Sequence, residues 1–173
     1  MKKILQGILI ALCFLFANQG IAQDTIHRTV GFSGTVQTSQ FGIEIPIWAS
    51  KNVSISPAID FQWAQKDGED YGFGIVPRFF FSSKKFAPYL GFRGGMLQFT
   101  PAKDNTIGVS TTDWVAGLEG GAQYFFDPRF SIGVELQANF TKSDKNSMRF
   151  GNPGNWNFNF ATMVSANVYF LRK

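Results

Sequence analysis

The sequence predicts an all-β chain that folds as an eight-stranded antiparallel up-and-down β-barrel. Three observations support this fold class. Apolar and polar residues alternate with a period of two through eight segments, turn signals separate these segments, and no window shows the period of an amphipathic helix. The composition agrees, because 20 Phe and 18 Gly among 173 residues favour strands and turns over helices.

The clearest unit is a hairpin over residues 114–140. In its second half every other residue from Phe130 to Phe140 is apolar, and the residues between them are polar or glycine. Its first half repeats the scheme, and Asp127-Pro128-Arg129 closes the hairpin, because proline suits the second position of a tight turn. One face of the hairpin is therefore wholly apolar.

The other strands follow from the same alternation in chain order. The first sets Val and Phe against Ser, Thr and Gln, and the second and third set Ile and Phe against Gly and Ser. The fourth and last strands carry several aromatic residues on their apolar faces. The fifth sets Leu, Phe and Met against Tyr, Gly and Arg, and a bulge is expected at Gly94-Gly95, where the alternation slips. The eight predicted strands are 29–37, 41–48, 53–65, 71–82, 86–99, 114–126, 130–140 and 158–170.

Residues 1–22 are predicted to be a secretory signal peptide and residues 23–173 a single barrel domain. Two lysines form the charged start, an apolar run follows, and Gly20-Ile21-Ala22 supplies small residues for cleavage. The apolar run is shorter than the roughly 20 residues that a spanning helix needs. Cys13 lies in this segment, so the mature domain has no cysteine for a disulfide, a thiolate metal site or a nucleophile.

Alternation alone does not distinguish a soluble lipocalin-like barrel, apolar inside, from an outer-membrane barrel, apolar outside. The polar face favours the second, because it combines small residues with six charges and no lysine, whereas a water-facing surface normally carries Lys and Glu. Short turns also alternate with longer polar connections, as in outer-membrane barrels. The six charged residues are Glu44, Asp60, Arg78, Arg93, Glu119 and Glu135.

Aromatic residues gather near both ends of the predicted strands, as in the interfacial girdles of membrane barrels. Most strands also have the ~9 to 11 residues that a tilted crossing requires, so the barrel is predicted to be transmembrane. The loop-end girdle is predicted to contain Phe61, Trp63, Tyr71, Phe73, Trp114, Phe140, Phe158 and Phe160. The turn-end girdle is predicted to contain Phe79, Phe81, Phe86, Tyr124, Phe125, Phe126, Phe130 and Phe170.

Three segments resemble the strand-turn-strand units of the small outer-membrane β-barrel family, the porin-like domain group of the OmpA and OmpX type. They are IEIPIWASKNVSISPAIDF, IVPRFFFSSKKFAPYLGFRGGM and EGGAQYFFDPRFSIGVELQANF. The resemblance covers essentially the whole mature chain and implies the barrel fold and an outer-membrane location. It also implies that the outer-membrane assembly machinery reads an aromatic at the end of the last strand, here Phe170, although Leu171-Arg172-Lys173 follow.

The six charges lie on successive strands and are predicted to form an ion-pair network that fills the lumen, because lone buried charges are costly. The alternative is a gated polar or proton path, and four acids against two arginines leave two carboxylates uncompensated. The network is expected to run around four adjacent strands through Asp60, Arg78, Arg93 and Glu119.

No enzymatic activity is predicted. Barrel-embedded hydrolases and acyltransferases pair a serine or an acid with histidine, and the only histidine, His27, precedes the first strand. No phosphate loop, metal-ligand spacing or nucleotide motif occurs, so no cofactor and no metal are expected. The net charge of +4 becomes +2 without Lys2 and Lys3, and no nucleic-acid partner is expected.

The sequence thus predicts an integral outer-membrane protein with both termini periplasmic and a structural or adhesin-like role through its loops. A narrow porin is the alternative with the same fold, and a soluble periplasmic or secreted barrel with an apolar ligand inside is the alternative with the opposite face outward. The expected partners are outer-membrane lipids beside the basic turn end, lipopolysaccharide or another surface ligand at the loops, and the assembly machinery.

Overall fold

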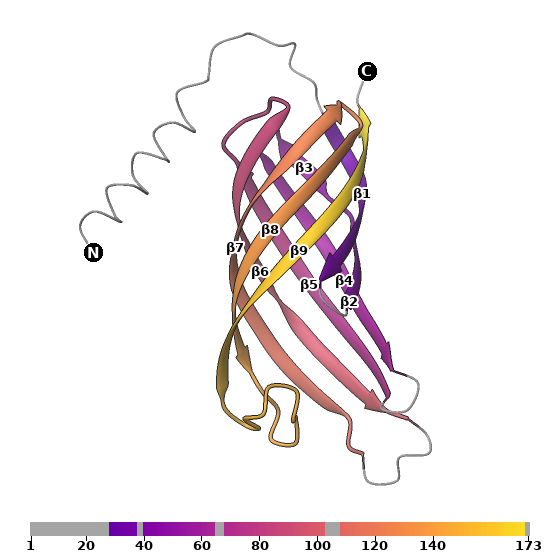
Figure 1. Ribbon diagram of the computed structural model, residues 1–173, viewed down its shortest axis with the longest axis vertical. Coiled ribbons are helices and arrows are strands. Elements are labelled where there is room, and N and C mark those ends of the chain that lie inside the picture. The colour runs from indigo at the N-terminus through magenta and orange to yellow at the C-terminus, as the bar shows by residue number, and fades with distance from the viewer. Residues whose placement is uncertain (1–27, 38–39, 65–67, 103–107, 172–173) are drawn as a thin grey trace, which may run out of the picture.

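The computed structural model describes one β-sheet closed into a barrel (Figure 1). The described residues are 28–37, 40–64, 68–102 and 108–171, and the predicted signal peptide and His27 lie outside them. Among the described residues there is no helix of the length and apolarity needed to cross a membrane. The strands are β1 (Arg28–Gln37), β2 (Gln40–Glu44), β3 (Ile47–Ser50), β4 (Val53–Ala64), β5 (Gly68–Phe80), β6 (Phe86–Pro101), β7 (Thr111–Asp127), β8 (Phe130–Lys142) and β9 (Trp156–Leu171).

Antiparallel pairing of the first and last strands closes the sheet. The ladder between β1 and β9 runs from Arg28 opposite Leu171 to Val36 opposite Val164. Strands β2 and β3 share one position in the barrel, because each pairs with β1 on one side and with β4 on the other. The barrel therefore has eight strand positions, and the predicted fold class is confirmed.

The second strand position is interrupted at Ile45 and Pro46. Proline has no N–H group and cannot donate to a ladder, so the strand is divided there. The backbone around the break remains paired, because Gly31 N donates to Pro46 O at 2.8 Å and Ile45 N donates to Pro57 O at 3.0 Å. The barrel wall is thus continuous across the proline.

The apolar face of every strand points away from the lumen. Leu90, Leu118 and Leu136 are 57–58% exposed in the middle of their strands, whereas inward side chains such as Ser56 and Ser131 are fully buried. A soluble barrel requires the opposite arrangement, since it must bury its apolar side chains. The alternative of a soluble barrel with an apolar interior is therefore wrong.

The two ends of the barrel differ. At one end, tight turns such as Lys51-Asn52 and Pro128-Arg129 join neighbouring strands, and Figure 1 shows that β9 ends there. At the other end, residues 143–155 form the long connection between β8 and β9. Strands β6 and β9 extend beyond their predicted limits, so the long connections are shorter than the sequence indicated.

The bulge expected at Gly94-Gly95 is absent from the described ladders. Strand β6 keeps one register with β7 from Phe86 opposite Tyr124 to Phe99 opposite Thr111. The apolar and polar residues stop alternating in this part of β6 because Leu97 points into the lumen. Its apolar side chain lines a cavity near the loop end.

A small aromatic cluster fills the lumen at the turn end. Phe80, Tyr89, Phe125 and Tyr169 are buried there, and Trp48 packs against them, with its ring centroid 4.8 Å from that of Phe80. The prediction that Phe125 belongs to the outer girdle is wrong. Odd-numbered residues of β7 point inward, so Phe125 is 3% exposed while its neighbour Phe126 is 55% exposed.

Replacing Phe125 by Ala is expected to lower the free energy of unfolding by about 3–5 kcal/mol, because the substitution leaves a cavity in a packed cluster. Urea titration of the refolded barrel, followed by gel mobility, measures this change. Phe126→Ala is the matched control, since it removes the same ring from the outer surface and leaves no cavity. Equal losses for the two variants would contradict the inward placement of Phe125.

Candidate functional site

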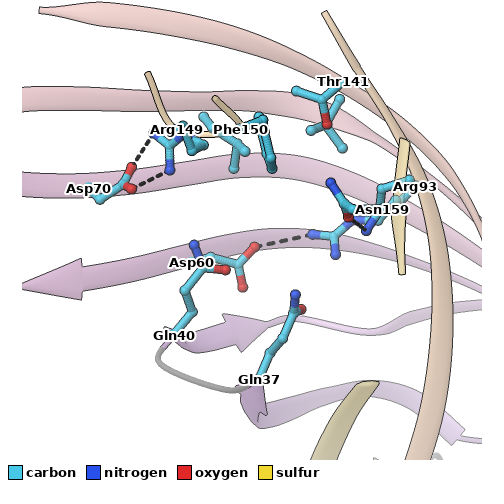
Figure 2. Close-up of a pocket in the computed structure, with 12 residues that line it drawn as sticks. Gln37, Gln40, Asp60, Asp70, Arg93, Thr141, Arg149, Phe150 and Asn159 are labelled. Atoms are coloured by element: carbon cyan, nitrogen blue, oxygen red, sulfur yellow. Dashed lines mark hydrogen bonds and ion pairs between the residues drawn. The ribbon is translucent and has the colours of Figure 1, made fainter. Parts of the chain in front are cut away.

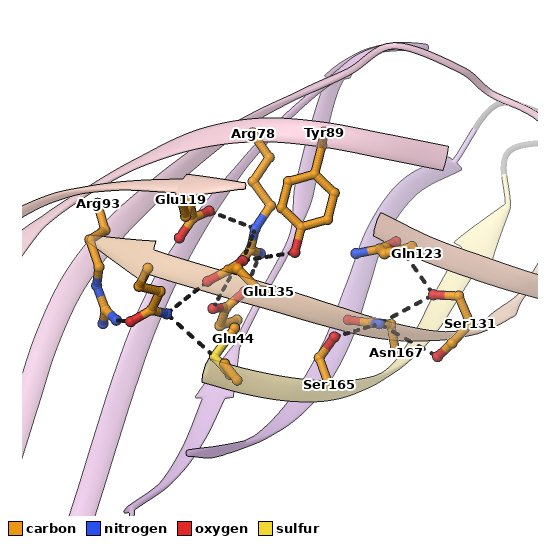
Figure 3. Close-up of polar contacts among 12 residues, drawn as sticks. Glu44, Arg78, Tyr89, Arg93, Glu119, Gln123, Ser131, Glu135, Ser165 and Asn167 are labelled. Atoms are coloured by element: carbon orange, nitrogen blue, oxygen red, sulfur yellow. Dashed lines mark hydrogen bonds and ion pairs between the residues drawn. The ribbon is translucent and has the colours of Figure 1, made fainter. Parts of the chain in front are cut away.

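A buried arginine lies at the centre of the lumen, where Arg78 of β5 contacts three carboxylates (Figure 3). Its Nη1 lies 2.5 Å from Glu44 Oε2, its Nη2 lies 2.9 Å from Glu135 Oε2, and its Nε lies 2.8 Å from Glu119 Oε1. The three acids come from β2, β7 and β8, none of which is next to β5 in the sheet. Arg78 therefore connects separate parts of the wall across the bore.

The barrel makes room for this centre by placing glycines beside large inward side chains. Gly91 lies opposite Arg78 in one ladder and opposite Glu119 in the next, and a side chain on Gly91 would collide with Glu119. Gly121 similarly leaves room for the ring of Tyr89, whose hydroxyl oxygen would lie 2.7 Å from a Cβ on this glycine.

Glu135 receives more hydrogen bonds than the other two acids. The Tyr89 hydroxyl donates to its Oε2 at 2.8 Å, and Gln137 Nε2 donates to its Oε1 at 2.7 Å. Glu119 instead makes an ionic contact with Arg78 and lies beside the carboxyl group of Glu135. Hydrogen bonds from neutral donors thus supplement the single guanidinium.

Arg93 forms a second group, nearer the loop end. Its Nη2 lies 3.2 Å from Asp60 Oδ2, and its Nη1 donates to Gln137 Oε1 at 2.6 Å. Because the amide of Gln137 also donates to Glu135, it links this pair to the Arg78 group. The structure thus brings the six sequence-predicted charges into two groups joined by Gln137, with contacts that cross the bore rather than follow adjacent strands.

A third group at the loop-end mouth was not predicted. Arg149 of the 143–155 connection pairs with Asp70 of β5 (Figure 2). It also pairs with Asp113 of β7, whose Oδ2 lies 3.0 Å from Arg149 Nε. Asp113 also accepts hydrogen bonds from the Ser147 hydroxyl and from the backbone N–H of Asp144, both at 2.8 Å. These contacts hold the connection against the barrel wall.

The sequence contained one signal for this third group. Strand β7 begins at Thr111, three residues before its predicted start. With this extension, Asp113 joins Val115, Gly117 and Glu119 among the inward residues of the strand. Arg149 had no such signal, because it lies in a connection without periodicity.

A polar cavity of about 200 Å³ lies between the Arg93 and Arg149 groups (Figure 2). The four charged residues that line it form two ion pairs, Arg93 with Asp60 and Arg149 with Asp70, so the lining has no net charge. The side chain of Phe150 also lines the cavity. Its amide lining consists of Gln37, Gln40, Asn139 and Asn159. The cavity suits water or a small neutral polar molecule.

No group of three or more His, Cys, Asp or Glu side chains in the described part of the chain is arranged to hold a metal ion. The acids of the lumen are instead directed at arginines. This arrangement compensates part of the carboxylate charge and cross-links the wall across the bore.

Replacing Arg78 by Met is expected to lower the free energy of unfolding by about 3–5 kcal/mol, because three buried carboxylates lose their guanidinium. Urea unfolding of the refolded barrel provides the measurement. Arg129→Met, in an exposed turn, is the control and should change the value by less than about 0.5 kcal/mol. Adding Glu44→Gln and Glu135→Gln to Arg78→Met should restore part of the loss, and no recovery would argue against a charge effect.

Replacing Arg149 by Ala is expected to release the 143–155 connection, since its ion pairs with Asp70 and Asp113 are lost. Cleavage of this connection by proteinase K should become roughly ten-fold faster or more, because charge-assisted hydrogen bonds each contribute about 1.5–3 kcal/mol. Lys145→Ala is the control within the same connection. An unchanged cleavage rate for Arg149→Ala would show that the ion pairs do not hold it.

Comparisons with known proteins agree with this architecture. No protein-family model and no curated protein matches the sequence. Among solved structures, the N-terminal β-barrel domain of Pseudomonas aeruginosa OprF matches with a TM-score of 0.60 and 11% identity, over 82% of this chain and 95% of that chain. Neisserial surface protein A matches with a TM-score of 0.57 and 13% identity, over 82% and 93% of the two chains.

The outer membrane enzyme PagL also matches, over 82% of this chain and 99% of that chain, but its TM-score of 0.40 at 11% identity is too low to support an argument. The two stronger matches cover nearly the whole described barrel at very low sequence identity. Such likeness establishes the fold and nothing finer. The chain has the fold of the small eight-stranded outer-membrane β-barrels.

Proposed function

We propose that the protein is a non-enzymatic integral outer-membrane β-barrel whose bore is blocked and whose interactions take place through its loops. The observation that carries this proposal is the combination of a closed sheet with an apolar exterior and a polar interior. Water solvates the polar faces of soluble proteins, so an apolar outer wall on every strand requires another solvent.

The hydrocarbon core of a membrane meets this requirement. Every backbone N–H and C=O group in lipid must be paired within the protein, and closure through β1 and β9 supplies the partners that an open edge would lack. Strands β4 to β9 have 12 to 17 residues each, which exceeds the ~9 to 11 residues of a tilted crossing.

The two kinds of barrel end support an orientation. Outer-membrane barrels place short turns on the periplasmic side and longer loops outside the cell. We therefore assign the turn end, with both termini, to the periplasm after removal of the signal peptide, and the 143–155 connection to the cell surface. Lys51 and Arg129 in the turns then lie beside anionic headgroups, and Phe170 is positioned for the assembly machinery.

Two features of the lumen support a blocked bore. The Arg78 group joins β2, β5, β7 and β8 across the interior, and the aromatic cluster around Tyr169 fills the turn end. An eight-stranded barrel has an interior just wide enough for side chains to fill. A narrow porin would need these groups to separate, so we favour the structural or surface-interaction role.

The loop end carries the features expected of an interaction surface. Met148 and Val109 are 71% and 57% exposed there, although most water-facing loops are polar. They line a cleft of about 440 Å³ with Phe99, and Arg149 forms part of the same lining. Held in place by Arg149 and Asp113, this surface is preorganised for a ligand or partner.

Protease treatment of intact cells tests location and orientation together. We expect cleavage within 143–155 and none at Lys51 or Arg129, and we expect the protein to remain with the membrane in carbonate. Release by carbonate without detergent would overturn the membrane assignment, and cleavage confined to the turns would reverse the orientation.

Planar-bilayer recording tests the blocked bore. The wild-type barrel should give no sustained conductance, whereas Arg78→Gly, which removes the central cross-link, should give small steps. Arg129→Gly is the control for non-specific leakage. Sustained steps from the wild-type protein, with a size that Arg78→Lys changes, would support the narrow porin instead.

A further inference from the structure

We propose that Trp114, Lys142, Lys145 and Trp156 form a binding site on the outer wall for the phosphate of a phosphorylated glycolipid. The inference rests on the membrane orientation proposed above and names one lipid partner within it. It concerns the lipid-facing side of β7, β8 and β9, which lie side by side in Figure 1, and not the lumen or the loop cleft.

The ladder places one lysine directly between two tryptophans. Trp114 lies opposite Lys142 in the pairing of β7 with β8, and Lys142 lies opposite Trp156 in the pairing of β8 with β9. Cross-strand partners share a face of the sheet, so all three side chains lie on the outward face. The tryptophans are 62% and 65% exposed, which leaves their rings available to lipid.

Lys142 is the only basic residue on the outward face of the described strands, since Arg28, Arg78 and Arg93 all point into the lumen. Its Nζ donates to Gly154 O at 2.7 Å and lies 6.0 Å from the centre of the Trp156 ring. An ammonium group has three N–H donors, so two remain for a ligand. The carbonyl contact fixes the direction of the lysine.

A second lysine approaches the same point of the 143–155 connection. A Cβ placed on Gly154 would lie 3.8 Å from Lys145 Cγ, so the stem of Lys145 lies beside the same glycine whose carbonyl oxygen accepts from Lys142. Gly154 adopts a φ of +71°, and its N–H donates to Asp144 O at 2.8 Å, which fixes this turn. No acidic side chain of the described residues forms an ion pair with either lysine.

The height of the site matches a headgroup rather than an acyl chain. Lys142 lies two residues nearer the loop end than Phe140, whose ring is 4.8 Å from that of Phe158 in the loop-end aromatic girdle. Tryptophan prefers the boundary between hydrocarbon and headgroups, and lysine above it meets phosphate. Asn152 in the adjoining connection is exposed, and Asn155 Nδ2 donates to its Oδ1 at 3.0 Å, which leaves the Asn152 amide N–H groups for sugar hydroxyls and favours a glycolipid.

Native mass spectrometry of the full barrel in maltoside micelles, which contain no phosphate, tests the proposal. The probes are lipid A bisphosphate, the same lipid with both phosphates removed, and phosphatidylglycerol. We expect the wild-type protein to bind lipid A bisphosphate at least ten-fold more tightly than either of the other lipids. Removing both lysines in Lys142→Gln/Lys145→Gln should weaken this binding about 25-fold, or about five-fold for each lysine.

Lys51→Gln/Lys85→Gln is the matched control, because it removes two exposed lysines from the turn end. Equal weakening by the two double variants would overturn the site, and so would equal wild-type binding of the dephosphorylated lipid or of phosphatidylglycerol. Insertion into phosphatidylcholine vesicles, followed by protease protection, is measured separately. Failure to insert would count against the proposed function, whereas insertion without preference for lipid A bisphosphate would count against this site alone.

Discussion

The structure depends on the closure of a single sheet. Once β1 pairs with β9, every strand has two neighbours. The sheet then has no edge strand with unpaired backbone N–H and C=O groups. Side chains of a strand alternate between two faces, so closure also divides the whole chain into an inside and an outside. The contrast between buried Phe125 and exposed Phe126 shows how sharply this division separates adjacent residues.

The narrow interior imposes a second constraint, which is on side-chain size. An inward position next to a large residue must be small, and Gly91 beside Glu119 and Gly121 beside Tyr89 show this directly. In the middle of the bore, the remaining volume is filled by hydrogen-bonded polar groups around Arg78 instead of by apolar packing. The polar lumen and the apolar exterior are thus consequences of the same geometry.

The two ends of the lumen are occupied differently. The turn end is filled by aromatic rings, and the guanidinium of Arg28 lies 3.7 Å from the centre of the Phe125 ring. The loop end is open enough to hold a polar cavity, and the ion pairs of Arg149 fasten the connection beside it. A closed wall with one fastened connection supports the surface-interaction role proposed above.

The sequence by itself determined the fold class, because period-two alternation is a local property. The small residues and the six charges without lysine on the polar face then determined that this face points inward and the apolar face outward. It did not determine which charges meet, since Arg78 and Glu135 lie on strands that are not neighbours. Only closure brings such residues together across the bore. The ion pairs of Arg149 with Asp70 and Asp113, and the approach of Lys145 to Gly154, were likewise decided by the tertiary structure, because an aperiodic connection carries no directional signal.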